Sequence, residues 1–476
     1  MAAAVERILA EGVTCWRVAR VGRVAVLVDG EEYFAALRAA LQRAERRIMI
    51  VGWDLDPGIR LEPDDPASEL RHVLRALVES RPELEIRLLI WDVAVLFGPS
   101  RVSEQLLATG WQQHPRIHFC FDGQHSRGGS HHEKIVTIDD ALAFAGGIDL
   151  TVERWDTARH EFDRPLRRDP GGEPYDPVHD LQMAVDGEAA RALALLTRER
   201  WQQATGEALA PVAATSDPWP EGLVPWLTEV PVGIARTRPA SGGRPATGEV
   251  AALNDAALAA ARHSVYIEAQ YLAATPVADR LAELLERADG PEIVLVVWRR
   301  ALGWIERFAM GSNRDRLLRR LAAADRHGRL LACWLGEPEA PHREINLHAK
   351  LIIVDDRFVR IGSSNLNHRS LGLDGECDLA IEAADERTRR AIAGLRDRLL
   401  AEHLVRPRDE VAAAVARHGL IGAIERLNRG AGRFRRHEID VAAGPSEPIA
   451  ATALLDPAEP LDLGYLGRLL KRSLTE

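Results

Sequence analysis

Two stretches of the chain repeat the same order of hydrophobic and polar positions. Residues 37–46 carry apolar side chains at helical spacing and lead directly into the apolar run of residues 47–53. About 207 to 217 positions later, residues 254–262 and 263–270 repeat this pattern. An amphipathic helix followed by an apolar strand is typical of α/β units. The pattern therefore predicts two copies of one α/β unit.

Further elements fall at matching positions in the two copies. The apolar runs 86–91 and 293–298 share Ile, Leu and Trp in register, and a second apolar strand follows each of them. Each copy then closes with a helical pattern, over residues 187–205 and 385–403. Strands that alternate with helices in this way predict the α/β fold class.

Composition divides the chain into four segments. Residues 1–210 form the first half, and residues 248–405 form the second. Residues 211–247 are rich in Pro, Ala, Gly and Thr, contain one strand-like piece, and are predicted to connect the halves. Residues 406–476 have no counterpart in the first copy, so we expect this helical and irregular tail to pack over the core.

Charge and hydropathy exclude several classes of protein. Among 476 residues, 61 are basic and 71 are acidic, so no global positive field attracts nucleic acid. The apolar runs are shorter than the ~20 residues that span a bilayer, and the N-terminus lacks an apolar signal core. The four cysteines are far apart, which favours free thiols in a reducing compartment. We expect a cytoplasmic protein without a transmembrane segment.

The distribution of lysine points to chemistry. Only three of the 61 basic residues are lysines, and two of them stand in the same motif, His-x-Lys-x4-Asp. The motif residues are His132, Lys134 and Asp139 in the first copy and His348, Lys350 and Asp355 in the second. An ammonium group is a compact point charge and a guanidinium is a broad fork, so a tight cationic site retains lysine.

Strand geometry brings the motif side chains together. Alternate side chains of a strand share one face, so the His and Lys of each motif point the same way. A segment of small residues begins seven positions after each motif aspartate and supplies Gly147 and Asp149, or Ser363 and Asn365. Small residues let backbone donors and a polar side chain approach the same point from a neighbouring strand.

This motif pair resembles the phospholipase D superfamily. Other segments resemble its phospholipase D and transphosphatidylase branch, namely residues 52–57, 147–156, 178–181, 266–271 and 365–370. The resemblance covers about residues 25–405. It implies two α/β/α sandwich halves related by a pseudo-twofold axis, with one active site between them.

The resemblance also implies roles for the site residues. His132 is expected to attack phosphorus and His348 to act as general acid and base, and the pseudo-symmetry leaves the opposite assignment open. Asp180 is expected behind His132 and Glu376 behind His348, each fixing the far ring nitrogen. Phosphate binding is assigned to Lys134, Lys350, Asp149, Asn365, Gly147 and Ser363, with Asp149 alternatively orienting a lysine, and Asp139 and Asp355 are expected to be structural. Further candidates for the pocket lining are Trp53, Glu268, Gln270 and Tyr271.

The predicted function is a metal-independent phospholipase D without a cofactor. Through a phosphohistidine, it would hydrolyse a phosphatidylcholine-like glycerophospholipid to phosphatidic acid and the head-group alcohol, or transfer the phosphatidyl group to another alcohol. We expect a monomer that contacts a membrane surface through apolar loops at residues 93–97 and 304–310. The alternatives are a nuclease or other phosphodiesterase of the superfamily, a transferase similar to cardiolipin synthase, and a non-catalytic scaffold.

Overall fold

The computed structural model describes residues 7–92, 110–241, 243–300, 310–340, 342–447 and 456–460. The strands of the first half are β1 (Arg17–Val28), β2 (Arg47–Gly52), β3 (Glu85–Trp91), β4 (Ile117–Asp122), β5 (Ile135–Ile138), β6 (Leu142–Gly146), β7 (Val178–His179) and β8 (Leu181–Asp186). Its main helices are α1 (Asp29–Leu41), α2 (Leu70–Ser80) and α5 (Gly187–Thr205).

The second half repeats this order. Its strands are β9 (Leu227–Arg238), β10 (Thr247–Gly248), β11 (Ser264–Ala269), β12 (Glu292–Val297), β13 (Leu330–Leu335), β14 (Asn346–Leu347), β15 (Lys350–Val354), β16 (Phe358–Gly362) and β17 (Glu376–Glu382). Its helices are α6 (Glu249–Ala259), α7 (Thr275–Glu286), α9 (Ser312–Ala324), α10 (His368–Gly372) and α11 (Glu386–Leu404). The tail adds α12 (Arg408–Leu427) and β18 (Phe434–Arg436).

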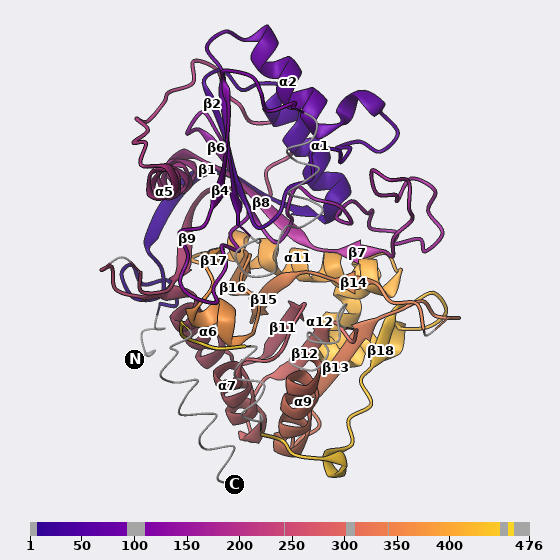
Figure 1. Cartoon of the computed structure of the whole chain (residues 1–476). Helices are drawn as coiled ribbons and strands as arrows, with labels where there is room; N and C mark the ends of the chain where they lie inside the picture. The colour runs from indigo at the N-terminus through magenta and orange to yellow at the C-terminus, as the bar shows by residue number, and fades with distance from the viewer. Residues whose placement is uncertain are drawn as a thin grey trace, which may run out of the picture.

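One continuous sheet runs through both halves (Figure 1). From its centre, the first half runs β1-β8-β6-β5-β2-β3-β4 and the second runs β9-β17-β16-β15-β11-β12-β13. The strands β1 and β9 pair antiparallel at the centre, with Val21 opposite Val230. The same order on both sides is the arrangement expected of a pseudo-twofold repeat. The predicted connection, residues 211–247, contains β9 and so supplies the counterpart of β1.

Helices cover both faces of the sheet in each half. In the first half, α1 and α2 pack on one face and α5 packs on the other. In the second half, α6, α7 and α9 cover one face, and α11 and α12 cover the other. Leu193 of α5 and Leu399 of α11 belong to one cluster of buried apolar side chains, so the halves share a core. The predicted α/β fold with two sandwich halves is confirmed.

Each motif strand ends at its aspartate in a tight turn. Asp139 and Asp355 have φ angles of 53° and 52°, in the left-handed region that Asp tolerates better than most residues. Asp139 accepts hydrogen bonds from the backbone N–H groups of residues 45–47, and Asp355 accepts them from residues 262–264. These aspartates therefore join the start of β2 or β11 to the end of β5 or β15. This is a structural role of the kind expected.

The tail packs against the second half. The strand β18 pairs antiparallel with β13, with Phe434 opposite Leu335, and Phe434 is buried. Leu420 and Ile424 of α12 are buried in the core shared by the halves. Described elements of the tail therefore lie against the core, and the packing of the whole tail over it stays a prediction. In the described part of the chain, no helix has both the length and the apolar character needed to cross a bilayer.

Candidate active site

The two motif histidines lie at the join between the halves, where the backbone of the opposite half holds each of them. The His132 N–H donates to the Gly375 carbonyl at 2.8 Å, and the His348 N–H donates to the His179 carbonyl at 2.8 Å. The second contact extends the short parallel pair formed by β14 and β7. Each motif is therefore fixed to the other half just before its own strand begins.

The side chains repeat this exchange between the halves. Nδ1 of His132 lies 3.0 and 3.1 Å from the two carboxylate oxygens of Glu376, and Nδ1 of His348 lies 2.6 Å from Asp180 Oδ2. The expected pairing, Asp180 behind His132 and Glu376 behind His348, is therefore wrong. The backbone contacts place Gly375 and His179 beside the histidines, so the next residue of the opposite half is the carboxylate within reach.

Further hydrogen bonds hold both carboxylates in place. Ser363 Oγ donates to Glu376 at 2.5 Å, and the Leu181 N–H donates to Asp180 at 2.8 Å. A carboxylate that accepts from Nδ1 fixes the tautomer of a neutral imidazole and leaves Nε2 free for chemistry. The site therefore presents two imidazoles of the same tautomer, one from each half.

The two lysines are held differently. Lys134 Nζ lies 2.9 Å from Asp149 Oδ2, and both side chains are 2% exposed. Lys350 Nζ instead donates to the neutral Gln270 side chain at 3.0 Å, and it contacts Nδ1 of His348 at 2.9 Å. Asp149 thus orients a lysine, which is the alternative considered for it. Lys134 is therefore neutralised by an ion pair, whereas Lys350 has no ion pair with any described residue.

Burial and positive charge shift the pKa values of the site. Burial, together with the charges of Lys134 and Lys350, lowers the pKa of His132 to about 3. Burial, Lys350 and Arg154 hold the pKa of His348 well below its ordinary value. Burial also lowers the pKa of Lys350 to about 7. Without substrate, both rings are therefore neutral and ready to accept a proton or a phosphoryl group.

The pKa values of the two carboxylates shift upwards, opposite to those of the histidines and Lys350. Burial raises the pKa of Glu376 to about 7 and that of Asp180 to about 6. Lys350 opposes the rise at Asp180, and a hydrogen bond from Ser363 opposes it at Glu376. Because these carboxylates must be ionised to accept from Nδ1–H, the site is fully assembled only near neutral pH or above.

Two residues expected to bind phosphate have other roles. The Gly147 N–H donates to the Leu181 carbonyl at 2.9 Å, and a Cβ at position 147 would overlap Asp180 Oδ1. Gly147 therefore makes room for that carboxylate. Ser363 donates its hydroxyl to Glu376 and its N–H to the Cys377 carbonyl, so neither group is free for phosphate. Neighbouring strands already use these groups, and the assignment of both residues to phosphate binding stays a prediction.

Asn365 remains available for a ligand. Its side chain is 5% exposed, and its Oδ1 has no hydrogen-bond partner among the described residues. The Asn365 N–H donates to Ser370 Oγ at 3.1 Å, which fixes the backbone. The side-chain amide is therefore positioned but not consumed.

Of the four strand-end candidates, one contacts the motif and one lies elsewhere. Gln270 receives the hydrogen bond from Lys350, and its own amide donates to the Tyr271 hydroxyl at 3.0 Å. The ring of Trp53 lies edge-on to that of His132, with centroids 6.4 Å apart. Glu268 is fully buried among other histidines, so it does not line this site.

Arg154 is a residue that the sequence assignments missed. Its charge lowers the pKa of both His348 and Lys350, which places the guanidinium close to the site. The Arg-Trp-Asp segment around it is among those that resemble the family, and this was the available signal.

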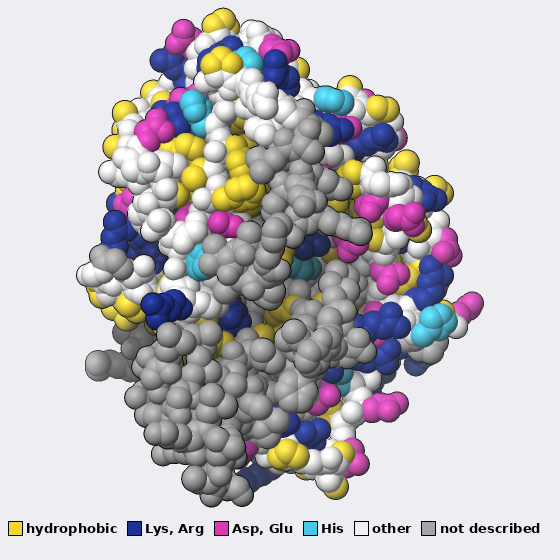
Figure 2. Space-filling view, in the orientation of Figure 1, with side chains coloured by type: hydrophobic (Ala, Val, Ile, Leu, Met, Phe, Trp, Pro, Cys, Tyr) yellow, Lys and Arg dark blue, Asp and Glu magenta, His cyan; other side chains and the backbone are white. Residues whose placement is uncertain are grey.

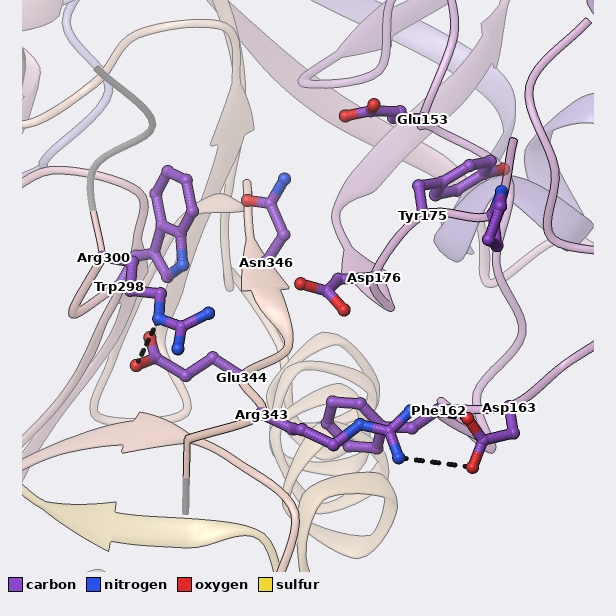
Figure 3. Close-up of a pocket in the computed structure, with 11 residues that line it drawn as sticks. Glu153, Phe162, Asp163, Tyr175, Asp176, Trp298, Arg300, Arg343, Glu344 and Asn346 are labelled. Carbon is purple, nitrogen blue, oxygen red and sulfur yellow. Dashed lines mark hydrogen bonds and ion pairs between the residues drawn. The ribbon is translucent and has the colours of Figure 1, made fainter. Parts of the chain in front are cut away.

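A pocket of about 620 Å³ lies close to His348 along the chain (Figure 3). Asn346 lines it and precedes His348 by two residues, or about 7 Å of extended chain. Its aromatic lining is Phe162, Tyr175 and Trp298, and its acidic lining is Glu153, Asp163, Asp176 and Glu344. Asp163 and Glu344 pair with Arg343 and Arg299, whereas Glu153 and Asp176 form no ion pair with any described residue.

The expected apolar rim cannot be placed. Residues 93–97 lie outside the described residues, as do residues 304–309 of the second loop. Met310, the last residue of that loop, is 9% exposed. The membrane-facing loops therefore stay a prediction.

Comparisons with known proteins agree with this fold. The family model described as "Cardiolipin synthase, PLD-like domain" matches residues 255–393. Phospholipase D A of Dictyostelium discoideum is 26% identical over 440 residues, which cover 76% of this chain and 33% of that protein. Cardiolipin synthase of Geobacillus thermodenitrificans (strain NG80-2) is 26% identical over 374 residues, covering 77% of this chain and 64% of that protein. The chain spans about a third of the length of the first phospholipase D relative.

A solved structure shares the fold. The crystal structure of phosphatidylserine synthase from Haemophilus influenzae Rd KW20 superposes with a TM-score of 0.57 at 15% identity, covering 86% of this chain and 96% of that one. This likeness shows that the two chains share an α/β fold. The family-model match and these relatives support the resemblance of the chain to the phospholipase D superfamily.

The exchange of carboxylates between the halves makes a specific prediction. Glu376→Gln should shift the ring-nitrogen NMR signals of His132 and leave those of His348 in place, and Asp180→Asn should do the reverse, because each carboxylate contacts only one ring. Histidine-labelled protein, with signals assigned from His132→Gln and His348→Gln, provides the measurement. Shifts in the opposite rings would restore pairing within each half.

Proposed function

We propose that the protein is a phospholipase D-type enzyme that cleaves the phosphodiester of a glycerophospholipid by two successive displacements. Phosphatidic acid and a head-group alcohol are the products, and transfer to a second alcohol is the other outcome. The proposal rests on the two motif histidines. In each, Nδ1 contacts a buried carboxylate of the opposite half, and a lysine of the same motif lies beside the ring.

In the first displacement, Nε2 of one histidine attacks phosphorus, and the bond from phosphorus to the head-group oxygen breaks. The other histidine, protonated, gives its proton to the departing oxygen. A neutral imidazole is required for the attack, and the low pKa of His132 provides one. The bound phosphodiester anion raises the pKa of the second imidazole, so substrate binding itself creates the acid.

In the second displacement, water or an alcohol attacks the phosphohistidine. The second histidine, now neutral, removes the proton from the attacking oxygen, and the bond between phosphorus and Nε2 breaks. Phosphatidic acid or a new phosphodiester leaves, and both rings return to their first state. Each ring changes its charge during the cycle, so each needs an anchored carboxylate.

We assign His132 as the nucleophile and His348 as the acid and base. The His132 side chain is 16% exposed and that of His348 is 8% exposed, so His132 is the more open to a bulky phosphorus centre. His348 also has Lys350 on its Nδ1 side, and this charge responds to bound anions. The opposite assignment would reverse which variant traps the intermediate.

We assign to Lys350, Lys134 and Asn365 the stabilisation of negative charge on the phosphoryl oxygens. Lys350 is paired only with neutral groups at hydrogen-bond distance, so its charge can act on a non-bridging oxygen. Asp149 does not repel phosphate, because Lys134 neutralises it. These donors stabilise the additional charge of the transition state.

The nearby pocket fits a cationic head group. Aromatic rings and the unpaired carboxylates of Glu153 and Asp176 are the groups that recognise a quaternary ammonium. Figure 3 shows both carboxylates facing the space between Trp298 and Tyr175. Among the described side chains on the face drawn in Figure 2, basic and acidic groups are interspersed, whereas a single-stranded nucleic acid favours a continuous basic track. A phosphatidylcholine-like lipid therefore suits the site better than an oligonucleotide does.

A synthase reaction is the second candidate. The match of residues 255–393 to the cardiolipin synthase model favours an alcohol as the acceptor rather than water. Both reactions use the same phosphohistidine. Product analysis with and without added glycerol, phosphatidylglycerol or ethanol separates them.

Loss of either histidine tests the mechanism. We expect His132→Ala and His348→Ala each to lower head-group release by about 10³-fold or more, because each removes a group with no substitute. His72→Ala, at an exposed position of α2, is the control and should retain normal turnover. Radiolabelled lipid should leave phosphohistidine on His132 in His348→Ala. Substantial release by either alanine variant would exclude the two-histidine mechanism.

The pKa shifts predict a narrow pH optimum. As pH rises, kcat/KM should increase while Asp180 and Glu376 ionise, near pH 6 to 7, and then fall as Lys350 loses its proton, near pH 7. Lys350→Arg should lower the rate and abolish the alkaline decline, because a guanidinium stays charged. Lys471→Arg is the matched control. An unchanged alkaline limb in Lys350→Arg would assign that limb to another group.

The pocket makes a prediction about substrate choice. Asp176→Asn and Glu153→Gln should each raise KM for phosphatidylcholine by roughly fivefold, the effect of losing about 1 kcal/mol of charge interaction, with little change for phosphatidylglycerol. Liposomes of each lipid provide the measurement, and Asp64→Asn, at an exposed site, is the control. Equal changes in KM for both lipids would show that the pocket does not recognise the head group.

A further inference from the structure

A second cluster of titratable side chains lies buried at the join between the halves. It contains Asp29 at the start of α1, His160 in the loop between β6 and β7, His179 of β7 and Glu402 of α11. Their side chains are between 0% and 4% exposed. The mechanism above uses none of these four residues.

One potential ligand atom from each of the four residues lies within 4.8 Å of the others. Nδ1 of His179 lies 2.9 Å from Asp29 Oδ1 and 3.0 Å from Glu402 Oε1. Nε2 of His160 lies 3.0 Å from the same Glu402 oxygen and 3.7 Å from Asp29 Oδ2. Ligand atoms placed tetrahedrally at zinc-type bond lengths of 2.0–2.1 Å are about 3.3 Å apart. The separations in the cluster bracket that value.

Hydrogen bonding among these groups is incomplete. Both oxygens of Asp29 and Nδ1 of His179 lack a hydrogen bond to any described residue, although they lie close together. The Nδ1 atom lies close to two carboxylate oxygens at once, and neither contact has hydrogen-bond geometry. Burying polar atoms without hydrogen-bond partners costs free energy. A cation bound between these atoms would remove that cost.

The outer nitrogens of both rings are bound as in a metal centre. Nδ1 of His160 lies 2.9 Å from Asp156, which also pairs with Arg167. Nε2 of His179 lies 2.9 Å from Glu268. Histidine ligands of metals almost always donate the far N–H to a carboxylate or carbonyl, which fixes the tautomer that ligates.

The charges of the cluster also favour a cation. Four buried carboxylates belong to it, those of Asp29, Asp156, Glu268 and Glu402. The guanidinium of Arg167 compensates that of Asp156, and Arg433 reaches only the backbone carbonyl of Glu402. Three carboxylates remain, and a divalent ion with neutral imidazoles, or protonation of both imidazoles, would compensate two of these charges.

We propose that Asp29, His160, His179 and Glu402 bind a divalent transition-metal ion of the zinc class. Two imidazoles and two carboxylates are ligands that zinc takes in four-coordinate sites, whereas Ca²⁺ and Mg²⁺ prefer oxygen alone. All four positions are filled by the protein and are buried, so the ion has no open position for substrate and is structural. The sequence predicts no metal site, so this proposal departs from that expectation.

The site would join the two halves. Asp29, His160 and His179 belong to the first half, and Glu402 belongs to α11 of the second (Figure 1). His179 precedes Asp180, and the Asp29 N–H donates to the Asp180 carbonyl at 2.9 Å. A bound ion would therefore also fix the carboxylate that holds His348.

Metal analysis of the purified full chain, prepared without metal-affinity resin, tests the proposal. We expect about one equivalent of zinc per chain, and a lower thermal midpoint after the metal is removed with a chelator under mildly denaturing conditions. Zinc should restore the midpoint, and Mg²⁺ or Ca²⁺ should not. Substitution by Co²⁺ should give the visible absorption of a four-coordinate site.

Variants locate the ion. Glu402→Gln and His160→Gln should lower zinc affinity by at least about tenfold and make the midpoint insensitive to chelator. His368→Gln is the matched control, because His368 pairs with Asp456 outside the cluster. This variant should bind zinc as the unaltered chain does. If a variant fails to fold, the zinc content, midpoint shift and cobalt spectrum of the unaltered chain still decide. A metal-free chain that zinc does not stabilise would overturn the proposal and leave protonated histidines as the counter-charge.

Discussion

The hydrogen bond between each motif histidine and a carboxylate of the opposite half is the constraint on which the site depends. Glu376 and Asp180 are buried at 1% and 3% exposure, and an isolated carboxylate at such a depth is strongly unfavourable. Each is compensated only when the other half is docked, because the histidine that donates to it comes from that half. Docking of the halves therefore also assembles the site. Neither half alone contains a motif histidine together with the carboxylate that fixes its ring.

Duplication does not make the two histidines equivalent. Lys134 is neutralised by Asp149, whereas the matching position in the second half is Asn365 and Lys350 is bound by a neutral amide. This single difference between carboxylate and amide places a neutralised cation beside His132 and a cation without an ion pair beside His348. The pseudo-twofold site therefore has a built-in polarity, which a mechanism with one nucleophile and one acid requires.

Much of the fold could be predicted from the sequence, because its signals are local. The paired helix-to-strand patterns, the motif strands and the role of Asp139 and Asp355 follow from spacing and residue type. The pairing of carboxylates could not be predicted, because it depends on how the halves dock. The same applies to Gly147 and Ser363, whose neighbours on adjacent strands determine what their groups can bind. The buried cluster joins residues from 29 to 402, and no spacing along the chain indicates it.

The buried cluster and the motif histidines are connected through β7, a strand of two residues. Adjacent residues of a strand point to opposite faces, so His179 and Asp180 direct their side chains to opposite sides of the β7 segment. A two-residue strand paired only with β14 has little rigidity of its own. The contacts of His179 with Asp29, Glu268 and Glu402 supply that rigidity on one side. A displacement of His179 would move the backbone that also carries Asp180, and with it the ring of His348. The buried charges therefore help to hold the backbone of Asp180 and the ring of His348 in place.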